Sequence, residues 1–427
     1  MNKTGNRRGA QRRKVAIASI GDRDAHEVIT DPEVPEPQAL FTPIVQEGGH
    51  RISVYLDRKA LCAELELLAE IVETKNLLPI YSHLLIEASG NRVILKAAGF
   101  TNMLRCEIEA DVREEGAICL PARKLHEIAR HLPGETLILR GETNAATLRC
   151  GDSRFRLNAI SPEDFPAAPA CNKFRAVVPG DLLLALVRST LFAARRENES
   201  GYYALDSAQL TIGTNGARMI ATDGHRLSCA QRTDVKMNEE FILLVPRAAL
   251  SALTKVLGSS EGEVSIGADE NHAFFNIGSR RFSCSLLNGR FPDCEPLVSQ
   301  DYRHELTLDT TIFKDAVNRM AVFGADNSRR NFGLIKFHLA PDTCEMQSMD
   351  SQGSEGQEEI TLLSSGADEE ITLSFNGRYL QDFARTVSGP LLTIRYNDEI
   401  SSIEFCPTDD NNDGSFFKKY ILMPCRV

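Results

Sequence analysis

The 427-residue sequence contains no long hydrophobic run, and this absence excludes a first large class of proteins. A membrane-spanning helix needs about 20 consecutive apolar residues, and no segment approaches that length. The Arg-rich start is followed by no apolar stretch, so it does not resemble a cleaved secretory signal. The sequence therefore predicts a protein without a membrane anchor, located in the cytoplasm.

The sequence also lacks any C-x-x-C pair. Its 11 cysteines are scattered singly and their number is odd, so neither a zinc ribbon nor a secreted disulfide framework is indicated. We expect reduced, mostly buried thiols, as in cytosolic proteins. Neither a phosphate-binding G-x-x-x-x-G-K-[ST], nor H-E-x-x-H, nor a dinucleotide fingerprint is present. We therefore expect no metal ion and no cofactor.

One short motif is typical of serine hydrolases. Residues 258–262, GSSEG, fit the pattern G-x-S-x-G. That nucleophile motif needs a strand before the serine and a helix after it. The sequence predicts the reverse order, with a helix in VPRAALSALTKVL before the motif and a strand in EVSIGA after it. We interpret the segment as a loop and predict a protein that is not an enzyme.

Charge is distributed unevenly along the chain. The formal net charge of −11 argues against indiscriminate coating of nucleic acid. Residues 1–49 have too few apolar groups to form a core, and we predict a disordered N-terminal extension. The basic arm within it, Asn2 to Lys14, either holds DNA loosely or is a solvated extension without a role.

Six predicted helices are basic relative to the rest of the chain. Their windows (58–75, 121–132, 180–199, 246–257, 312–330 and 376–387) carry a total formal charge of +6, and the N-terminal tail is neutral. Strands and loops therefore carry −17. If all six helices face the same way, they form a positive surface that holds a phosphate backbone without reading base sequence. For any single helix, the alternative is that Lys and Arg merely solvate its outer face.

A pattern of three repeats runs through the chain after the tail. The helix-like segments LPARKLHEIARHL, VPRAALSALTKVL and FNGRYLQDFARTV begin at Leu120, Val245 and Phe375, which are 125 and 130 residues apart. GDSRFRL and GSRRFSC repeat likewise, with Phe155 and Phe282 separated by 127 residues. Alternating apolar and polar residues between the helices predict antiparallel strands. The predicted fold class is α+β, with two helices plus antiparallel sheets in each of three domains, 50–170, 171–299 and 300–427.

These repeats resemble the bacterial replicative sliding clamp family, the beta subunit of DNA polymerase III. The shared motifs are KNLLPIYSHLLIEA from Lys75, SRFRLNAISPEDFP from Ser153, YYALDS from Tyr202, ATDGHRLS from Ala221, NGRFPD from Asn288 and the terminal YILMPCRV. They occur in family order and cover residues 50–427. The resemblance implies a head-to-tail homodimeric ring of clamp-type domains, with helices lining the hole.

The function that this resemblance implies is topological. The ring encircles double-stranded DNA, slides on it through weak and screened contacts, and confers processivity by tethering the replicative polymerase. The implied partners are the DNA polymerase III alpha subunit, an ATP-driven clamp loader, and other proteins with clamp-binding motifs, namely repair polymerases, mismatch repair proteins and ligase. Two alternatives remain open: a protein-interaction scaffold that does not bind DNA, and a specialised, diverged clamp with altered partner choice.

The resemblance also implies a pocket for short, mostly apolar partner peptides, located between the second and third domains. Its residues, carried over from the matching motifs, are Ala204, Thr222, Gly224, His225, Arg226, Leu227, Pro292, Leu297, Ile400, Ser402, Leu422, Met423, Pro424, Cys425, Arg426 and Val427. The sequence departs from the family pattern at one of these residues and at one position beside them. Ala204 is smaller than the usual apolar residue, and Pro296 replaces a common basic one. Both departures could change which peptides bind.

Two further sets of residues follow from the same reasoning. The residues expected to contact DNA are Lys75, Asn198, Tyr202 and Tyr203 by resemblance, and Arg123, Arg247 and Arg378 from helix charge. The alternative for the two tyrosines is core packing. At the dimer interface, Phe155 of one subunit is expected to meet Val322 and Phe323 of the other. The first repeat also departs from the family, because it reads LKAAGFTNML where a T-x-T-D-L-type strand is usual.

Overall fold

The computed structural model describes residues 51–73, 78–171, 173–196, 203–235, 237, 239–323, 333–341, 343–366, 369–408 and 416–426. All of them belong to one compact unit, Gly48–Val427. Outside the described residues lie the predicted N-terminal extension, four of the predicted site residues and the side chain of a fifth. These are Lys75, Asn198, Tyr202 and Val427, and the side chain of Tyr203.

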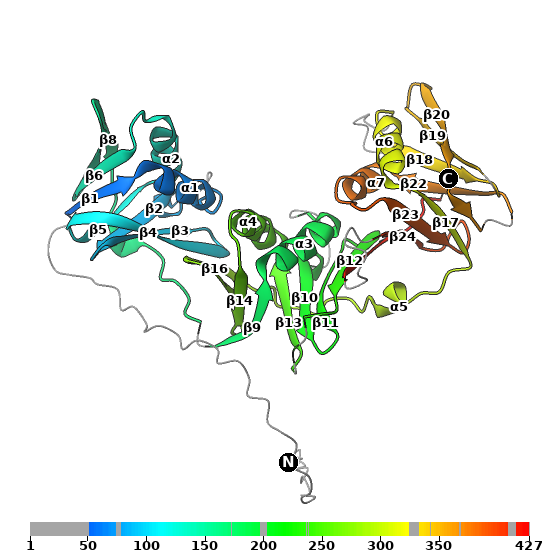
Figure 1. Ribbon diagram of the computed structural model, residues 1–427, viewed down its shortest axis with the longest axis horizontal. Coiled ribbons are helices and arrows are strands. Elements are labelled where there is room, and N and C mark those ends of the chain that lie inside the picture. The colour runs from blue at the N-terminus through cyan, green and yellow to red at the C-terminus, as the bar shows by residue number, and fades with distance from the viewer. Residues whose placement is uncertain are drawn as a thin grey trace, which may run out of the picture. The chain divides into compact units, whose positions relative to one another are not determined.

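The same order of elements occurs three times along the chain (Figure 1). Each domain consists of a strand, a helix, four strands, a second helix and three strands, which confirms the predicted α+β repeats. In the first domain the elements are β1 (Ile52–Asp57), α1 (Arg58–Ala69), β2 (His83–Ser89), β3 (Arg92–Ala98), β4 (Asn102–Glu114), β5 (Gly116–Pro121), α2 (Ala122–His131), β6 (Thr136–Glu142), β7 (Ala145–Cys150) and β8 (Ser153–Asn158).

The second and third domains repeat this order with few additions. The second domain has β9 (Phe174–Pro179), α3 (Gly180–Thr190), β10 (Ser207–Gly213), β11 (Gly216–Thr222), β12 (Arg226–Arg232), β13 (Phe241–Pro246), α4 (Arg247–Gly258), β14 (Glu263–Ala268), β15 (His272–Ile277) and β16 (Arg280–Ser285). The third has β17 (His304–Asp309), α6 (Thr310–Met320), β18 (Leu334–Leu339), β19 (Thr343–Met349), β20 (Glu355–Thr361), β22 (Ile371–Asn376), α7 (Gly377–Ala384), β23 (Leu391–Tyr396), β24 (Ile403–Pro407) and β25 (Phe416–Leu422). The additions are α5 (Glu295–Val298), β21 (Ser364–Ser365) and the 3-10 helices η1 (Pro79–Ser82), η2 (Pro162–Asp164), η3 (Leu191–Ala193) and η4 (Tyr203–Asp206).

The first helices of the first and third domains begin at aspartates that end a strand. The Asp57 side chain accepts a hydrogen bond from the backbone N–H of Ala60 at 2.7 Å. Asp309 accepts hydrogen bonds from Thr311 and Ile312 in the same way. An aspartate at this position satisfies backbone N–H groups that the first helical turn leaves free. Both helices therefore begin directly after a strand, at Arg58 and Thr310.

Each domain contains two antiparallel sets of four strands, and in the first domain β1 joins the sets by also pairing with β4. The middle four strands pair in the order β5-β2-β3-β4, and the equivalent orders are β13-β10-β11-β12 and β22-β18-β19-β20. The remaining four pair as β1-β6-β7-β8, β9-β14-β15-β16 and β17-β23-β24-β25. The segment that departs from the family in the first repeat forms an ordinary hairpin, since β3 and β4 pair without a break in register from Arg92↔Glu109 to Ala98↔Met103.

The sheets continue from one domain to the next by a single pairing rule. Strand β4 of the first domain pairs antiparallel with β16 of the second, and β12 of the second pairs antiparallel with β25 of the third. In both cases the edge strand of the middle-strand sheet (β4 or β12) pairs with the edge strand of the other sheet in the following domain (β16 or β25). Within the described residues, β20 pairs only with β19 and β8 only with β7. The rule therefore leaves one strand without its equivalent partner at each end of the chain.

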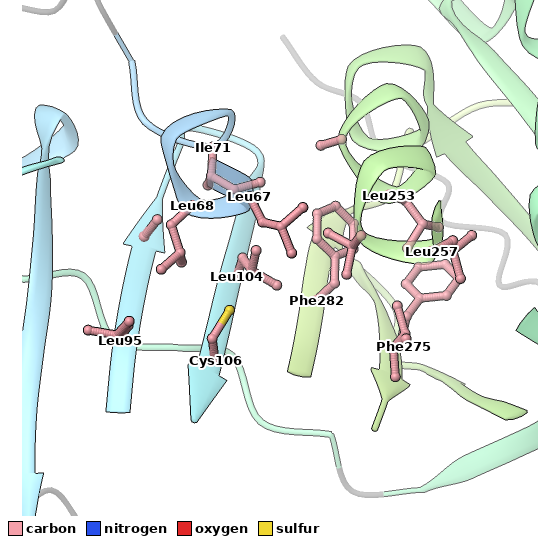
Figure 2. Packing of buried hydrophobic residues seen from close by; sticks show 14 of the residues in the cluster. Leu67, Leu68, Ile71, Leu95, Leu104, Cys106, Leu253, Leu257, Phe275 and Phe282 are labelled. Carbon is pink, nitrogen blue, oxygen red and sulfur yellow. The ribbon is translucent and has the colours of Figure 1, made fainter. Parts of the chain in front are cut away.

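A continuous apolar core fills the junction between the first and second domains. Phe282 of β16 is paired with Leu104 of β4, and both are almost fully buried. Figure 2 shows Phe282 between Leu67 and Ile71 at the end of α1 on one side and Leu253 of α4 on the other. All five belong to the same hydrophobic cluster. Burial of a large aromatic residue at this place stabilises the pairing of the two domains.

A buried ion pair crosses the same junction. The Arg280 guanidinium on β16 donates to both carboxylate oxygens of Glu64 on α1, at 2.8 and 2.6 Å. Its third nitrogen donates to the side-chain hydroxyls of Ser259 and Ser260. These serines belong to the GSSEG segment, which lies between α4 and β14 as predicted. The serine hydroxyls of this loop therefore support the arginine between the domains.

We expect replacement of Arg280 alone to lower the free energy of unfolding more than replacement of Arg280 and Glu64 together. Arg280→Met leaves the Glu64 carboxylate buried without its counter-ion, and we expect it to lower the free energy of unfolding by about 3–5 kcal/mol. Adding Glu64→Gln should recover part of that loss. Urea unfolding followed by circular dichroism measures both effects. As a control, Arg92→Met breaks the exposed Arg92–Glu107 pair and should cost less than about 1 kcal/mol. Strictly additive losses from the two changes would contradict the coupling.

Candidate functional site

The segment between β11 and β12 forms a turn that its residue types explain. The Asp223 carboxylate accepts hydrogen bonds from the backbone N–H groups of His225 and Arg226 at 3.0 and 3.1 Å. The Thr222 hydroxyl donates to the carbonyl of Arg226 at 2.6 Å and accepts from the N–H of Gly224 at 3.1 Å. Gly224 has a φ of +91°, a conformation that other residues rarely adopt. The T-D-G-H-R sequence therefore encodes a self-supported turn.

Arg226 joins this turn to the third domain from a buried position. Its guanidinium donates to Asp223 at 2.9 Å, to Asp382 of α7 at 2.9 Å and to the carbonyl of Phe192 at 2.8 Å. The guanidinium carbon lies 4.2 Å from the ring centroid of Tyr379, also on α7. Charge-assisted hydrogen bonds and a cation–π contact of this kind fix an arginine in place. Arg226 is therefore a buried structural support of the turn, since only 6% of its surface is exposed.

The C-terminal segment runs beside the turn. Leu422, at the end of β25, pairs with Arg226 on one side and with Ile403 on the other. The N–H of Met423 then donates to the carbonyl of His225 at 3.1 Å, and the N–H of Cys425 donates to the carbonyl of Ser374 at 2.7 Å. Backbone hydrogen bonds therefore hold the tail between the second and third domains. Burial raises the pKa of the Cys425 thiol.

The other carried-over residues reach the same region from three further segments. The Ser402 hydroxyl donates to Gln300 at 2.8 Å, and Ile400 is more than half exposed two residues earlier. Leu297 lies on α5, which packs through one face onto a cluster containing Leu227. We call the assembled residues the junction surface, and they are Thr222–Leu227, Pro292, Leu297, Ile400, Ser402 and Leu422–Arg426. Ala204 is buried next to Gly289, near the start of the segment that leads to Pro292.

Sequence reasoning missed several residues that shape this surface. Tyr379 stacks 6.5 Å from His225 between ring centroids and supports Arg226. Asp382 supplies the counter-ion for Arg226 from 156 positions away in the sequence. Both lie on α7, a segment that the sequence marked only as a repeated, basic helix. An aromatic and an acidic residue on an amphipathic helix carry no local signal for contacts with a distant turn.

The arginines expected to contact DNA differ in exposure and in hydrogen bonding to the protein. Arg123 on α2 and Arg378 on α7 are exposed. Arg247, at the first position of α4, donates to the carbonyls of Leu191 and Ala194 at 3.1 and 3.0 Å. Its guanidinium therefore binds carbonyl groups beyond the end of α3 as well as carrying charge. Its role as a DNA contact remains a prediction.

Three apolar residues expected at a dimer interface lie at the two strands left over by the pairing rule. Phe155 on β8 is 40% exposed, whereas Phe282, at the equivalent position of β16, is 1% exposed. Val322 is 70% exposed just after α6. The Phe323 ring lies so close to Gly356 of β20 that a Cβ atom there would collide with it. Phe323 follows the capping Asp309 by the same number of residues as Ile71 follows Asp57.

The two leftover strands also differ in charge. On β8 the exposed residues include Arg154 and Arg156. On β20 they include Glu355 and Glu359. An exposed strand edge offers unpaired backbone groups to another chain, and opposite charges favour pairing of one edge with the other.

Several features bear on other kinds of site. The 11 cysteines are all free thiols, and most of them are buried, as predicted. In the described part of the chain, no group of three or more His, Cys, Asp or Glu side chains is arranged to hold a metal ion. No helix of the described residues is long and apolar enough to cross a lipid bilayer.

Comparison with known families divides the chain in the same three parts. The DNA polymerase III beta subunit models match in chain order, with the N-terminal domain at residues 52–169, the central domain at 177–293 and the C-terminal domain at 296–426. Curated relatives include the beta sliding clamp of Caulobacter vibrioides, 29% identical over 87% of this chain and 99% of the relative. The beta sliding clamp of Pseudomonas putida is 28% identical with the same coverage.

Solved structures give the same result for the fold. A DnaN sliding clamp (DNA polymerase III subunit beta) from Pseudomonas aeruginosa, bound to griselimycin, has a TM-score of 0.79 at 25% identity, and covers 89% of this chain and 100% of that one. The griselimycin-bound clamp of Bartonella birtlesii has a TM-score of 0.79 at 26% identity, over 88% and 100% of the two chains. The chain therefore belongs to the family of the bacterial DNA polymerase III beta subunit, the beta sliding clamps.

Proposed function

We propose that two copies of this sliding clamp close head to tail into a ring around double-stranded DNA. The observation that carries the proposal is the pairing rule between domains. The rule is satisfied twice inside the chain, by β4–β16 and by β12–β25. Applied a third time, the pairing rule joins β20 of one copy to β8 of another. Because each copy offers both strands, two copies satisfy each other completely and close a cyclic dimer.

The apolar residues at the two strands support this closure. Phe282 is buried between α1 and α4 at the junction inside the chain (Figure 2), and Ile71 belongs to the same hydrophobic cluster. Phe155 and Phe323 occupy the equivalent positions of the open junction. Pairing of β8 with β20 would bring Phe155 of one copy against Val322 and Phe323 of the other. Burial of the exposed part of Phe155 and Val322 then supplies the driving force.

The helices provide the chemistry for DNA. Each domain packs its two helices side by side, as α1 with α2, α3 with α4 and α6 with α7 (Figure 1). Exposed cations such as Arg123 and Arg378 would face the phosphate backbone from the wall of the hole. Such contacts are individually weak and screened by salt, so the ring slides while topology prevents its release. The clamp needs no reaction chemistry of its own for this role.

The junction surface is the proposed binding site for partner peptides. Leu297, Ile400 and Met423 are exposed apolar side chains at adjoining ends of α5, β24 and β25. A flexible methionine adapts to more than one partner side chain. We propose that the DNA polymerase III alpha subunit, the clamp loader, repair polymerases, mismatch repair proteins and ligase bind here through short apolar motifs. The tethered polymerase then works at high effective concentration on DNA in the cytoplasm.

A charged residue in place of Phe155 should break the ring. Phe155→Asp puts a carboxylate where the model of closure requires an apolar contact, next to the acidic strand β20. We expect the dimer to dissociate at least about 30-fold more readily, or about 2 kcal/mol. Sedimentation velocity over a dilution series measures this. Phe100→Asp is the matched control, because Phe100 is 64% exposed but lies on neither leftover strand. Equal dimer affinities for the two variants would refute the interface.

Topological binding makes a direct prediction about release from DNA. Once a clamp loader has placed the clamp on a nicked circular plasmid, it should stay bound through gel filtration. Cutting the circle with a restriction enzyme should release it within minutes, because the ring slides off a free end. The comparison is between intact and linearised circles of one preparation. Prompt loss from the intact circle would contradict encirclement and would favour a scaffold that does not bind DNA.

Changes in the tail should weaken peptide binding strongly without affecting the dimer. Deleting residues 423–427 removes the exposed Met423 and the backbone contacts that hold the tail. We expect the affinity for a fluorescent peptide from the alpha subunit's clamp-binding motif to fall at least tenfold by anisotropy. Met423→Asp should do the same. Met349→Asp, at an exposed methionine on β19, should leave affinity unchanged. Full peptide affinity after the deletion would refute the site.

A further inference from the structure

The short helix α5 carries Leu297 to the junction surface but cannot hold itself in place. It has only four residues, Glu295–Val298, with Pro296 in its first turn. Isolated helices of this length are not stable in water, so contacts with the rest of the protein must set its position. One such contact is apolar, because Val298 is buried in a small cluster while Leu297 is 39% exposed. The other members of that cluster are Ile220, Leu227, Cys229, Phe291, Cys294 and Ile421.

Two cations from different domains bind the two ends of α5. At its beginning, Arg218 of β11 donates to the Glu295 carboxylate at 2.8 Å. At its end, Lys419 of β25 donates to the carbonyl of Val298 at 3.0 Å. Lys419 also forms an ion pair with the buried Glu404, at 3.0 Å. The Lys419 contact is thus part of the core of the third domain, whereas the Arg218 contact concerns α5 alone.

Tight packing does not hold the Glu295 side chain in place at the beginning of α5. A polar cavity of about 470 Å³ adjoins Arg218 and Glu295, and its other walls include Thr211, Gln231 and Glu240. Glu295 therefore has open space into which it can turn. The hydrogen bond from Arg218 is the main cause that holds the pKa of Glu295 below its ordinary value. The carboxylate is charged at neutral pH, and the pair persists until the pH falls through that lowered pKa.

The contribution of Arg218 to the free energy of unfolding does not explain why an arginine occupies this position. Its Nε and Nη2 atoms are buried without a hydrogen bond of good geometry in the described part of the chain, and the neighbouring Cys229 thiol is only a weak partner. Burying such groups costs free energy. Its one ion pair is made to a side chain that is 58% exposed, and pairs of that kind add little to stability. A role in placing α5 explains why the arginine lies in this unfavourable position.

We propose that Arg218 is a positioning residue for peptide binding: its ion pair with Glu295 holds α5 so that Leu297 meets the partner peptide. The inference rests on the proposed peptide site at the junction surface. Arg218 itself does not touch the peptide. The ion pair joins the body of the second domain to the beginning of α5, while Lys419 of the third domain binds its end.

A double-mutant cycle tests this coupling. The variants are Arg218→Gln, Glu295→Gln and the pair together, measured by anisotropy with the fluorescent alpha-subunit peptide. We expect each single change to weaken binding about three- to tenfold. The double variant should be no worse than either single one, because both changes remove one interaction. Arg218→Lys keeps the charge and should restore part of the affinity.

The controls separate this inference from the proposed function. Arg232→Gln breaks a similar ion pair with Asp234 on the same sheet, away from α5, and should bind the peptide normally. Thermal melting and sedimentation should show an unchanged fold and dimer for Glu295→Gln, whose side chain is mostly exposed. If the wild-type clamp fails to bind the peptide, the proposed site is wrong. If the wild type binds but the cycle is additive or without effect, the role of Arg218 alone is overturned.

Discussion

Antiparallel strand pairing across domain boundaries is the constraint on which the rest of this structure depends. It makes three similar domains into one unit, because β16 continues the sheet of β4 and β25 continues the sheet of β12. The same pairing also determines what lies at each junction, since the strands bring Phe282 and Arg280 against α1. A chain built by such a rule must end with two unmatched strands. We propose that a second copy covers these two strands by closing the ring.

The two kinds of junction differ in how firmly they are held. Inside the chain, the Glu64–Arg280 pair is buried and reinforced by the GSSEG serines. At the equivalent positions of the open junction, Ala316 and Ser153 cannot form that pair. In the proposed ring, exposed charges on β8 and β20 would take its place, and salt screens such charges. In the proposed ring, the contact between subunits would therefore be weaker than the contacts inside the chain.

Much of the fold was predictable from the sequence because its signals are local and repeated. Alternating strands follow from neighbouring residues, and the three repeats are visible because similar motifs recur, as at Phe155 and Phe282. The segment that forms the turn at Thr222–Arg226 was recognisable as a family motif. The supports of the junction surface were not, because Asp382 and Tyr379 meet Arg226 only after two domains have joined. Equally, no local pattern indicated that Arg247 would bind carbonyl groups near the end of α3.

Amide hydrogen exchange of β8 and β20 across a dilution series tests the central claim most directly. Strands paired with another copy are protected only while the dimer exists, whereas β12 and β16 are paired within the chain. The account predicts that the amides of β8 and β20 lose protection together on dilution, at the concentration where the dimer dissociates, while β12 and β16 stay protected. Equal exchange of β8 and β20 at every concentration would contradict closure through these strands.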